Sequence, residues 1–300
     1  MRPVVLVVGD AGLDVLAKHS GPVAPDGDSP AEVSMALGGA AANTAAWLAA
    51  LGADPVLVGR VGADPAGAQV RAELTAAGVR LALRVDESAR TCCVVVLVDE
   101  RGQRSMLPDR GAGTRLAAAD LAPELLAEAV HLHLSGYVLL DPRSRPAGVA
   151  MLAAARAAGL STSVDPQSAP LIHDPAGFLA AVRGVDLLLP NADELAALTG
   201  SPDPATAQEL LSTVGAVAVT LGADGACWVD QNEISTVGAQ PADCVDSTGA
   251  GDAFDAGLLT AWLTGAGPVA ALRAGVRAGS SAVGRVGAHP RRSGQTSITG

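Results

Sequence analysis

The chain has 300 residues, of which 49% are hydrophobic and 2% aromatic, and its formal net charge at pH 7 is −11. This composition is enough for one large α/β domain or two modest ones with an aliphatic core, and the negative charge argues against nucleic acid or an anionic membrane as a partner. No apolar stretch approaches the roughly 20 residues that span a bilayer, and the N-terminus is unlike a secretory signal, so we expect a cytoplasmic protein.

The predicted strands are short apolar runs. The first is "VVLVVGD" at residues 4–10, which is typical of a buried parallel strand. Similar runs occupy residues 54–62, 130–140, 161–167, 185–194 and 216–225. Helical stretches rich in alanine and leucine lie between several of them, at residues 41–51, 65–77, 146–158, 176–182, 192–199 and 204–213. This alternation predicts an α/β fold with a mostly parallel, doubly wound sheet, which binds ligands outside the carboxyl ends of its strands.

Two segments, residues 13–37 and 84–109, break this alternation. They contain alternating or β-branched runs without intervening helices, such as "TCCVVVLVDERGQRSML" at residues 91–107. These runs predict a small antiparallel sheet that is inserted beside the main sheet and acts as a lid. We expect one domain over residues 1–300, and a homodimer in which the second face of the lid pairs with another subunit.

Residues 246–257 read "DSTGAGDAFDAG" and precede an apolar helical run. A helix start exposes unpaired backbone N–H groups and carries about half a positive charge, and glycine lets a ligand approach the backbone closely. We therefore predict that the backbone N–H groups of Gly249, Ala250 and Gly251 form an anion hole that suits a transferring phosphoryl group. Asp252 follows in the first turn, either as an acid favoured by the helix dipole or as a general base beside the anion hole.

The count of lysines restricts how phosphate could be bound. Lysine occurs once in the chain, at Lys18. A Walker-type phosphate loop and a protein kinase each need a lysine at the phosphates, and Lys18 has neither sequence context. Phosphate chemistry in this chain must therefore use another device, such as backbone amides and a metal ion.

Five motifs in order along the chain resemble the signatures of the ribokinase-like (PfkB) family of carbohydrate and nucleoside kinases. They are "GGAAANTAAWLAALG" (38–52), "VGRVGADPAG" (58–67), "NADE" (191–194), "TLGADGA" (220–226) and "DSTGAGDAF" (246–254). The resemblance covers nearly the whole chain and implies transfer of the ATP γ-phosphoryl group to a hydroxymethyl oxygen of a small sugar or sugar derivative. A nucleoside kinase, acting for example on pseudouridine or adenosine, and a non-catalytic sugar or nucleotide sensor are the alternatives.

The resemblance assigns roles on the acceptor side. It makes Asp252 the catalytic base, with the preceding glycine turn holding the migrating charge. Gly38 and Gly39 would let the backbone approach sugar hydroxyls, and Asn43 would offer both a donor and an acceptor. Asp14, just beyond the first strand, resembles the family's substrate-binding aspartate.

The resemblance also assigns the ATP and Mg²⁺ side. Asn191 and Glu194, three residues apart on one face of a helical turn, would position Mg²⁺ largely through water. The other interpretation of this pair is a variant of the capping box at a helix start. Thr220, Gly222 and Gly225 would line the nucleotide site.

A monovalent-cation site is the last feature that the resemblance implies. The segment "AVGRVGAH" at residues 282–289 resembles the one that forms this site, together with Asp246 and Thr248, in many members of the family. Ala282, Arg285 and Gly287 would contribute to it, mainly through carbonyl groups, and the ion would be K⁺.

Other polar residues admit several interpretations. A lid hairpin that returns to the cleft would bring Arg110 against the substrate or a phosphate, although a surface or capping role is an alternative. Arg104 or Arg110 would suit a sugar acid as acceptor, while Tyr137 would stack on a ring or cap an apolar face. His131 and His133 alternate in a strand with no third ligand nearby, so we expect polar strand residues instead of a metal site.

Overall fold

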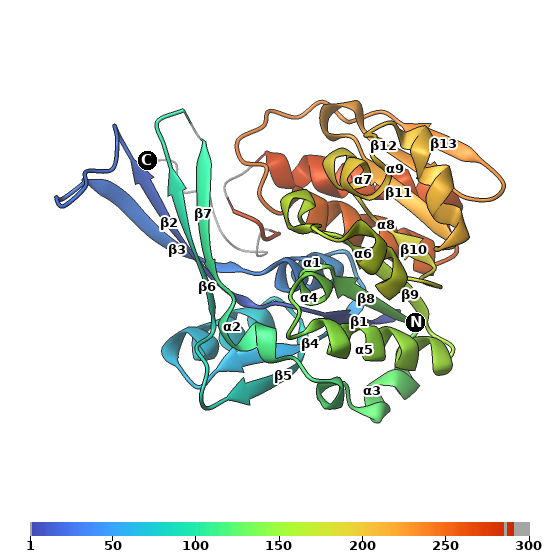
Figure 1. Cartoon of the computed structure of the whole chain (residues 1–300), viewed down its shortest axis with the longest axis horizontal. Coiled ribbons are helices and arrows are strands. Elements are labelled where there is room, and N and C mark those ends of the chain that lie inside the picture. Colours follow the sequence, from blue (N-terminus) through green and yellow to red (C-terminus); the bar gives the residue numbers. More distant parts are fainter. Residues whose placement is uncertain (1, 102, 285–286, 291–300) are drawn as a thin grey trace.

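The computed structural model describes residues 2–101, 103–284 and 287–290, and within these residues the chain forms two sheets (Figure 1). The main sheet has nine strands in the order β13-β12-β11-β10-β9-β8-β1-β4-β5. They are β1 (Val4–Val8), β4 (Asp54–Gly62), β5 (Arg80–Asp86), β8 (His131–Ser135), β9 (Ser161–Asp165), β10 (Leu187–Leu188), β11 (Ala216–Thr220), β12 (Ala226–Val229) and β13 (Ile234–Val237). Neighbours from β5 to β11 are parallel, and β12 and β13 add an antiparallel edge, which confirms the mostly parallel sheet.

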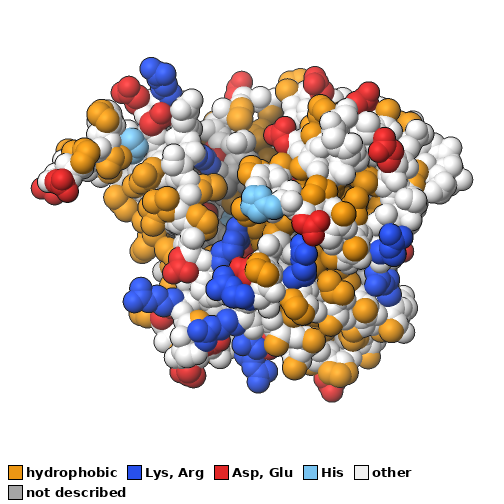
Figure 2. Space-filling model, viewed as in Figure 1, with side chains coloured by type: hydrophobic (Ala, Val, Ile, Leu, Met, Phe, Trp, Pro, Cys, Tyr) orange, Lys and Arg blue, Asp and Glu red, His pale blue; other side chains and the backbone are white. Residues whose placement is uncertain are grey.

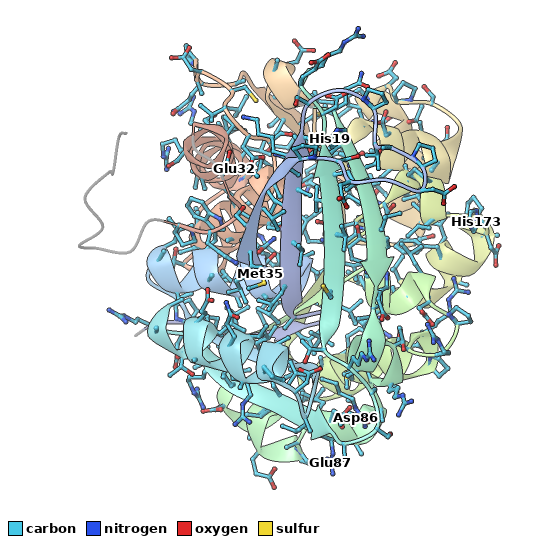
Figure 3. The ribbon with its side chains drawn as sticks, turned by 90° about the vertical axis from the view of Figure 1, so that its left-hand side faces the viewer. His19, Glu32, Met35, Asp86, Glu87 and His173 are labelled. Carbon is cyan, nitrogen blue, oxygen red and sulfur yellow. The ribbon has the colours of Figure 1, made fainter. Side chains whose placement is uncertain are left out.

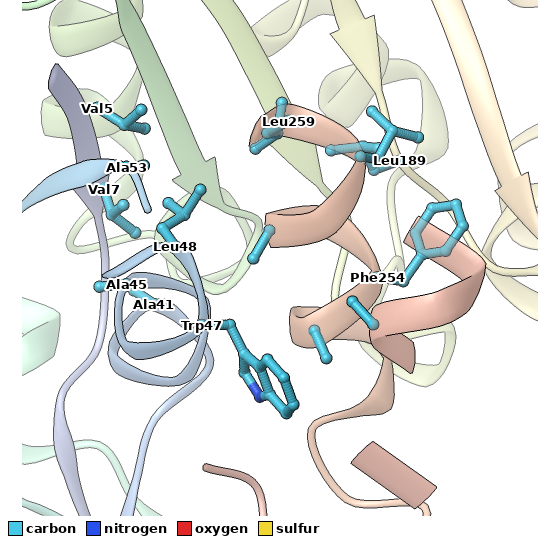
Figure 4. Close-up of a cluster of buried hydrophobic side chains, with 14 of the residues drawn as sticks. Val5, Val7, Ala41, Ala45, Trp47, Leu48, Ala53, Leu189, Phe254 and Leu259 are labelled. Atoms are coloured by element: carbon cyan, nitrogen blue, oxygen red, sulfur yellow. The ribbon is translucent and has the colours of Figure 1, made fainter. Parts of the chain in front are cut away.

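Helices cover both faces of the main sheet because successive residues of each strand point to opposite faces. One face packs against α1 (Ala40–Ala50), α2 (Pro65–Ala76), α8 (Ala250–Leu263) and α9 (Pro268–Val283). The other packs against α3 (Pro123–Glu128), α4 (Tyr137–Leu140), α5 (Arg145–Ala157), α6 (Pro175–Ala181) and α7 (Ala192–Thr199). Short 3₁₀ helices span Gly111–Arg115, Ala118–Asp120, Ala169–Leu171, Pro204–Ser212 and Gly222–Asp224. Figure 4 shows part of the largely aliphatic first cluster, in which α1 and α8 lie close together.

The small sheet stands at one side of the main body (left in Figure 1) and has the order β3-β2-β6-β7. Its strands are β2 (Gly12–His19), β3 (Ala31–Gly38), β6 (Cys92–Val98) and β7 (Arg104–Asp109). β2 and β6 pair in parallel, so the expectation of a wholly antiparallel sheet is wrong at this one pairing. The reason is that β2 and β6 follow main-sheet strands and leave the main body in the same direction. Residues 84–86, which we expected in this sheet, belong to β5 of the main sheet.

Two predicted elements differ from the structure for local reasons. The helix expected at residues 204–213 is a 3₁₀ helix over Pro204–Ser212. The apolar run at residues 130–140 divides, because β8 ends at Ser135 and α4 begins at Tyr137. No helix of the described residues has the length and apolar character needed to cross a membrane.

Candidate active site

The candidate site residues gather near the carboxyl ends of the parallel strands, where the small sheet leaves the main body. β1 ends just before Asp10, β9 ends at Asp165, and β11 ends at Thr220. Figure 2 shows the surface hollowed between the small sheet and the main body, with basic side chains along the hollow. Doubly wound sheets bind their ligands at this end of the strands.

The turn before α8 has a backbone shape that requires glycine. Gly249 adopts a φ of 73° and forms the N-cap of α8, and a Cβ added to it would lie 2.6 Å from the Cβ of Ala288. Ala250 and Gly251 open the first helical turn, where backbone N–H groups have no acceptor within the helix. We call residues 249–251 the anion turn, because their amides and the positive end of the helix dipole favour a negative ligand.

Asp252 lies in the first turn of α8 with only 7% of its surface exposed. The Nδ2 of Asn43, on α1, donates a hydrogen bond of 2.8 Å to Oδ2 of Asp252. Burial raises the pKa of Asp252 to about 7; the Asn43 hydrogen bond opposes this rise, and the charge of Asp10 adds to it. A carboxylate with a pKa near neutrality is suited to take a proton from an acceptor hydroxyl.

Asp14, Gly38 and Gly39 meet where β2 and β3 leave the main body. A Cβ on Gly38 would overlap the carboxylate of Asp14, so glycine makes room for this acid. Gly39 is the N-cap of α1 with a φ of 97°, and a Cβ there would lie 2.7 Å from the carbonyl oxygen of Asp10. Burial, followed by the charge of Asp10, raises the pKa of Asp14 to about 6. Two acids and a closely approaching backbone are therefore brought together.

Arg110 follows β7 and lies against Tyr137 and Asp10. Its guanidinium carbon is 3.7 Å from the centroid of the Tyr137 ring, and its Nη1 is 3.9 Å from Oδ2 of Asp10. All three residues line one small cavity. Because the guanidinium covers one face of the ring, that face of Tyr137 is already stacked.

A pocket of about 610 Å³ opens beside the anion turn. Thr220, Gly222 and Gly225 line it together with Ala250 and Gly251. Residues 239–242, Cys244 and Ser247 of the preceding loop, Ala223 and side chains of α8 and α9 complete the wall. The structure thus brings the expected nucleotide residues and the anion turn to one pocket of a size typical for small-molecule sites.

Asn191 and Glu194 form a reciprocal cap at the start of α7. Oδ1 of Asn191 accepts from the backbone N–H of Glu194 at 2.8 Å, and Oε2 of Glu194 accepts from the backbone N–H of Asn191 at 2.9 Å. The capping interpretation is therefore correct for the local structure. Burial raises the pKa of Glu194 to about 7, which leaves a buried carboxyl group that a nearby cation would stabilise in its charged form.

Asp246, in the loop before the anion turn, has a buried carboxylate with several donors. Its Oδ1 accepts from the backbone N–H of Thr248 at 2.8 Å, and its Oδ2 accepts from the backbone N–H of Gly287 at 3.0 Å. Ala282 is buried in α9, close to this loop in the chain fold. Arg285, also expected at a cation site, lies outside the described residues.

Comparison with known proteins places the chain in a family. The sequence profile of the pfkB family carbohydrate kinases matches residues 3–292. The chain belongs to this family. Its curated relatives include the ATP-dependent ribose-1-phosphate kinase of Halopiger xanaduensis, 33% identical over 269 residues that cover 88% of this chain and 87% of the relative. The fructokinase of Klebsiella pneumoniae is 34% identical over 270 residues, covering 86% of this chain and 84% of the relative.

Solved structures confirm the ribokinase-like fold of this pfkB kinase. The adenosine kinase of Sinorhizobium meliloti superposes with a TM-score of 0.86 and 26% identity over 97% of each chain. The Arabidopsis thaliana ribokinase complexed with ribose and ATP gives 0.81 and 27%, over 96% of this chain and 95% of that one. The chain is therefore a sugar or nucleoside kinase, a phosphotransferase with an alcohol group as acceptor.

Three acidic or amide side chains behind Asp252 in this pfkB kinase were not singled out from the sequence. Gln167 follows β9 with a φ of 74°, which is rare for a residue other than glycine. Its Nε2 donates a hydrogen bond of 2.6 Å to Oδ2 of Asp165, and its side chain lowers the pKa of Asp252, against the larger effect of burial. Burial raises the pKa of both Asp165 and Asp255, and the charge of Asp165 adds to the rise at Asp255. The one sequence signal was "DPQ" directly after a buried strand.

The histidines of β8 are inside the protein instead of at its surface. His131 bonds Ser161 and Ser163 at 2.8 Å, and His133 bonds Ser163 at 2.8 Å. Burial lowers the pKa of His131 to about 3 and that of His133 to about 4, so both are neutral at pH 7. In the part of the chain that the structure describes, no cluster of His, Cys, Asp and Glu is arranged to hold a metal.

Proposed function

We propose that this pfkB kinase transfers the γ-phosphoryl group of ATP to a hydroxymethyl oxygen of a small sugar or sugar derivative. One observation carries the proposal: a buried carboxylate directly follows an amide turn that borders a nucleotide-sized pocket. Asp252 is held by Asn43 at 2.8 Å, and Gly251 lines the 610 Å³ pocket. The base and the anion hole therefore lie within one turn of helix.

The residues of the site divide the chemical work. Asp252 accepts the proton of the acceptor hydroxyl while the oxygen of that hydroxyl bonds to the γ-phosphorus. The bond from that phosphorus to the β,γ-bridging oxygen breaks, and ADP leaves with the electron pair. Amides of residues 249–251 stabilise the charge on the migrating group. Because these amides bind the phosphate, a lysine is not required there. Asp14 and the backbone at Gly38 and Gly39 hold the acceptor.

Magnesium fits the donor set at the start of α7. The carboxylate of Glu194 and the amide oxygen of Asn191 are the hard oxygen groups that Mg²⁺ prefers, and the ion keeps several waters. When bound, Mg²⁺ would neutralise phosphate charge during transfer. A Ribokinase II structure from E. coli with ATP and Mg²⁺ has the same fold, with a TM-score of 0.84 at 23% identity over 96% of this chain and 94% of that one. A K⁺ site at Asp246, Thr248 and Gly287 stays a prediction, and so does a cytoplasmic location.

A screen for ADP release over sugars, sugar acids, sugar phosphates and nucleosides would identify the acceptor. Fructose and ribose 1-phosphate come first, because relatives of 33–34% identity carry those names. A nucleoside is the second candidate on the strength of the adenosine kinase fold match, although Arg110 already stacks on one face of Tyr137. If none of these compounds leads to release of ADP but one of them binds measurably, the protein is a sensor.

We further propose that the small sheet acts as a lid and that its outer face forms a homodimer. Register places Met35, Val15, Val95 and Leu107 in one row across all four strands. Met35 is 62% exposed and Leu107 is 60% exposed, and Figure 3 looks onto this side of the sheet, with Met35 labelled. A second copy of the same face would bury this apolar row symmetrically.

A further inference from the structure

An arginine of the small sheet reaches across the hollow to the loop before the anion turn. Arg104 is the first residue of β7, and its Nη2 lies 2.6 Å from Oδ1 of Asp246. The side chain of Arg104 is 26% exposed, whereas that of Asp246 is 2% exposed. The pair therefore joins a long, partly exposed side chain of the small sheet to a buried carboxylate of the main body.

Asp246 transmits this contact directly to the anion turn. The same Oδ1 that meets Arg104 accepts from the backbone N–H of Thr248, the residue immediately before Gly249. Its Oδ2 accepts from the N–H of Gly287, and its own N–H donates to the carbonyl of Val283 at 3.1 Å. Asp246 thus fixes the residue before the left-handed Gly249, and the direction of the following amides depends on it.

The charge of Asp246 needs a partner for electrostatic reasons. Its side chain is only 2% exposed, and its two oxygens meet the guanidinium of Arg104 and the backbone N–H groups of Thr248 and Gly287. The carboxylate therefore lies, with donors on both oxygens, close to the place where phosphate would bind. Without the guanidinium, it would both lose a charge-assisted bond and repel an incoming phosphate.

We propose that Arg104 is a positioning residue, which couples the small sheet to the shape of the anion turn through Asp246. The inference rests on the proposed kinase function. Arg104 does not touch the reacting atoms. With the small sheet over the acceptor, its guanidinium holds Asp246, and Asp246 holds the backbone from which the amides project. Phosphoryl transfer is thereby favoured when the small sheet is in place.

The test compares Arg104→Gln, Arg104→Lys and the control Arg101→Gln, which removes the same charge at an exposed turn position next to β7. We expect Arg104→Gln to lower kcat about tenfold or more, since small misplacements of catalytic groups have effects of this size. Its Kd for the acceptor, measured by calorimetry, should change less than about twofold, because Arg104 acts on the phosphate side. Arg104→Lys should recover part of kcat, and Arg101→Gln should match the wild type.

A second readout does not depend on turnover. Hydrogen exchange of a peptide containing residues 246–251 should be faster in Arg104→Gln than in the wild type. If Arg104 acts through Asp246, the double variant Arg104→Gln/Asp246→Asn should exchange no faster than Asp246→Asn alone. Unchanged exchange, additive effects in the double variant, or loss of acceptor binding with intact kcat would overturn the coupling. If the wild type releases no ADP with any acceptor, the proposed function fails, while exchange in the ligand-free protein still decides whether Arg104 orders the turn.

Discussion

The hydrogen bond from Asn43 to Asp252 sets the pH at which the base works. Because burial raises the pKa of Asp252 to about 7, the acid limb of the kcat/KM profile should have its midpoint near pH 7. Replacing Asn43 by leucine removes a donor to the ionised carboxylate. Such bonds contribute roughly 1.5–3 kcal/mol, which corresponds to about one to two pKa units at about 1.36 kcal/mol per unit.

Asn43→Leu should therefore move the midpoint upward by about one to two units. At pH 7 the variant would lose roughly 5- to 50-fold in kcat/KM, because half of the wild-type base is already protonated at that pH, and much of the loss would be recovered above pH 9. If Asn43 instead served to bind the acceptor, the substitution would lower kcat/KM by the same factor at every pH. The shift of the midpoint thus separates control of the base from binding of the acceptor.

Asp10→Asn is the matched variant with the opposite sign. The charge of Asp10 raises the pKa of Asp252, so removing this charge should move the midpoint downward. Both profiles come from initial rates of ADP release between pH 5 and 10. A midpoint that stays in place in both variants, or that moves the same way in both, would show that Asp252 is not the titrating base.

Four further outcomes are expected. Asp252→Asn should lower kcat at least about 10²-fold while calorimetry shows nearly unchanged acceptor binding, and similar turnover would exclude it as the base. Glu194→Gln keeps the cap but should raise the Mg²⁺ concentration for half-maximal rate about tenfold; an unchanged titration would remove it from the metal site. Met35→Glu should give a monomer in sedimentation and Leu171→Glu should not, whereas a wild-type monomer would end the dimer proposal. The ligand-free protein should melt about 5 °C lower at pH 8 than at pH 5. The reason is that Asp14, Asp252 and Glu194 have raised pKa values in the folded state. Their contribution to the free energy of unfolding is therefore fully present below pH 4 and is lost as the pH rises through 6 to 7. A higher melting temperature at pH 8 would contradict these shifts.

The parts of the site that were predictable from sequence are those built within a few residues. The turn at Gly249 needs a positive φ, which glycine adopts easily, so the glycine at this position in the sequence already predicts the turn. The pair Asn191 and Glu194 closes a cap across three residues. Alternation of apolar runs likewise predicted the parallel sheet, because burial on both faces leaves few polar positions in a strand.

Contacts between distant segments were not predictable in this way. The bond between Asn43 and Asp252 spans 209 residues, and nothing in either segment specifies which oxygen or nitrogen meets the other. Gln167 bonds to Asp165 only two residues away, but its importance to the site comes from the distant Asp252, whose pKa it lowers, and this link is not visible in the local sequence. The parallel pairing of β2 with β6 depends on where the strands leave the main body, which alternation alone does not encode.

The acids of the site concentrate negative charge, and Arg104 and the raised pKa values together reduce the resulting repulsion. Asp14 and Asp252 would repel both each other and an incoming nucleotide if fully ionised, and burial raises their pKa values to about 6 and 7, so near neutral pH each is neutral for a larger share of the time than an exposed aspartate. Asp246 is instead kept ionised, since Arg104 pairs with it at 2.6 Å. The acid that shapes the backbone therefore carries a permanent charge with a fixed partner. The acid that accepts the proton remains free to titrate, which is what a base must do to work in both halves of a catalytic cycle.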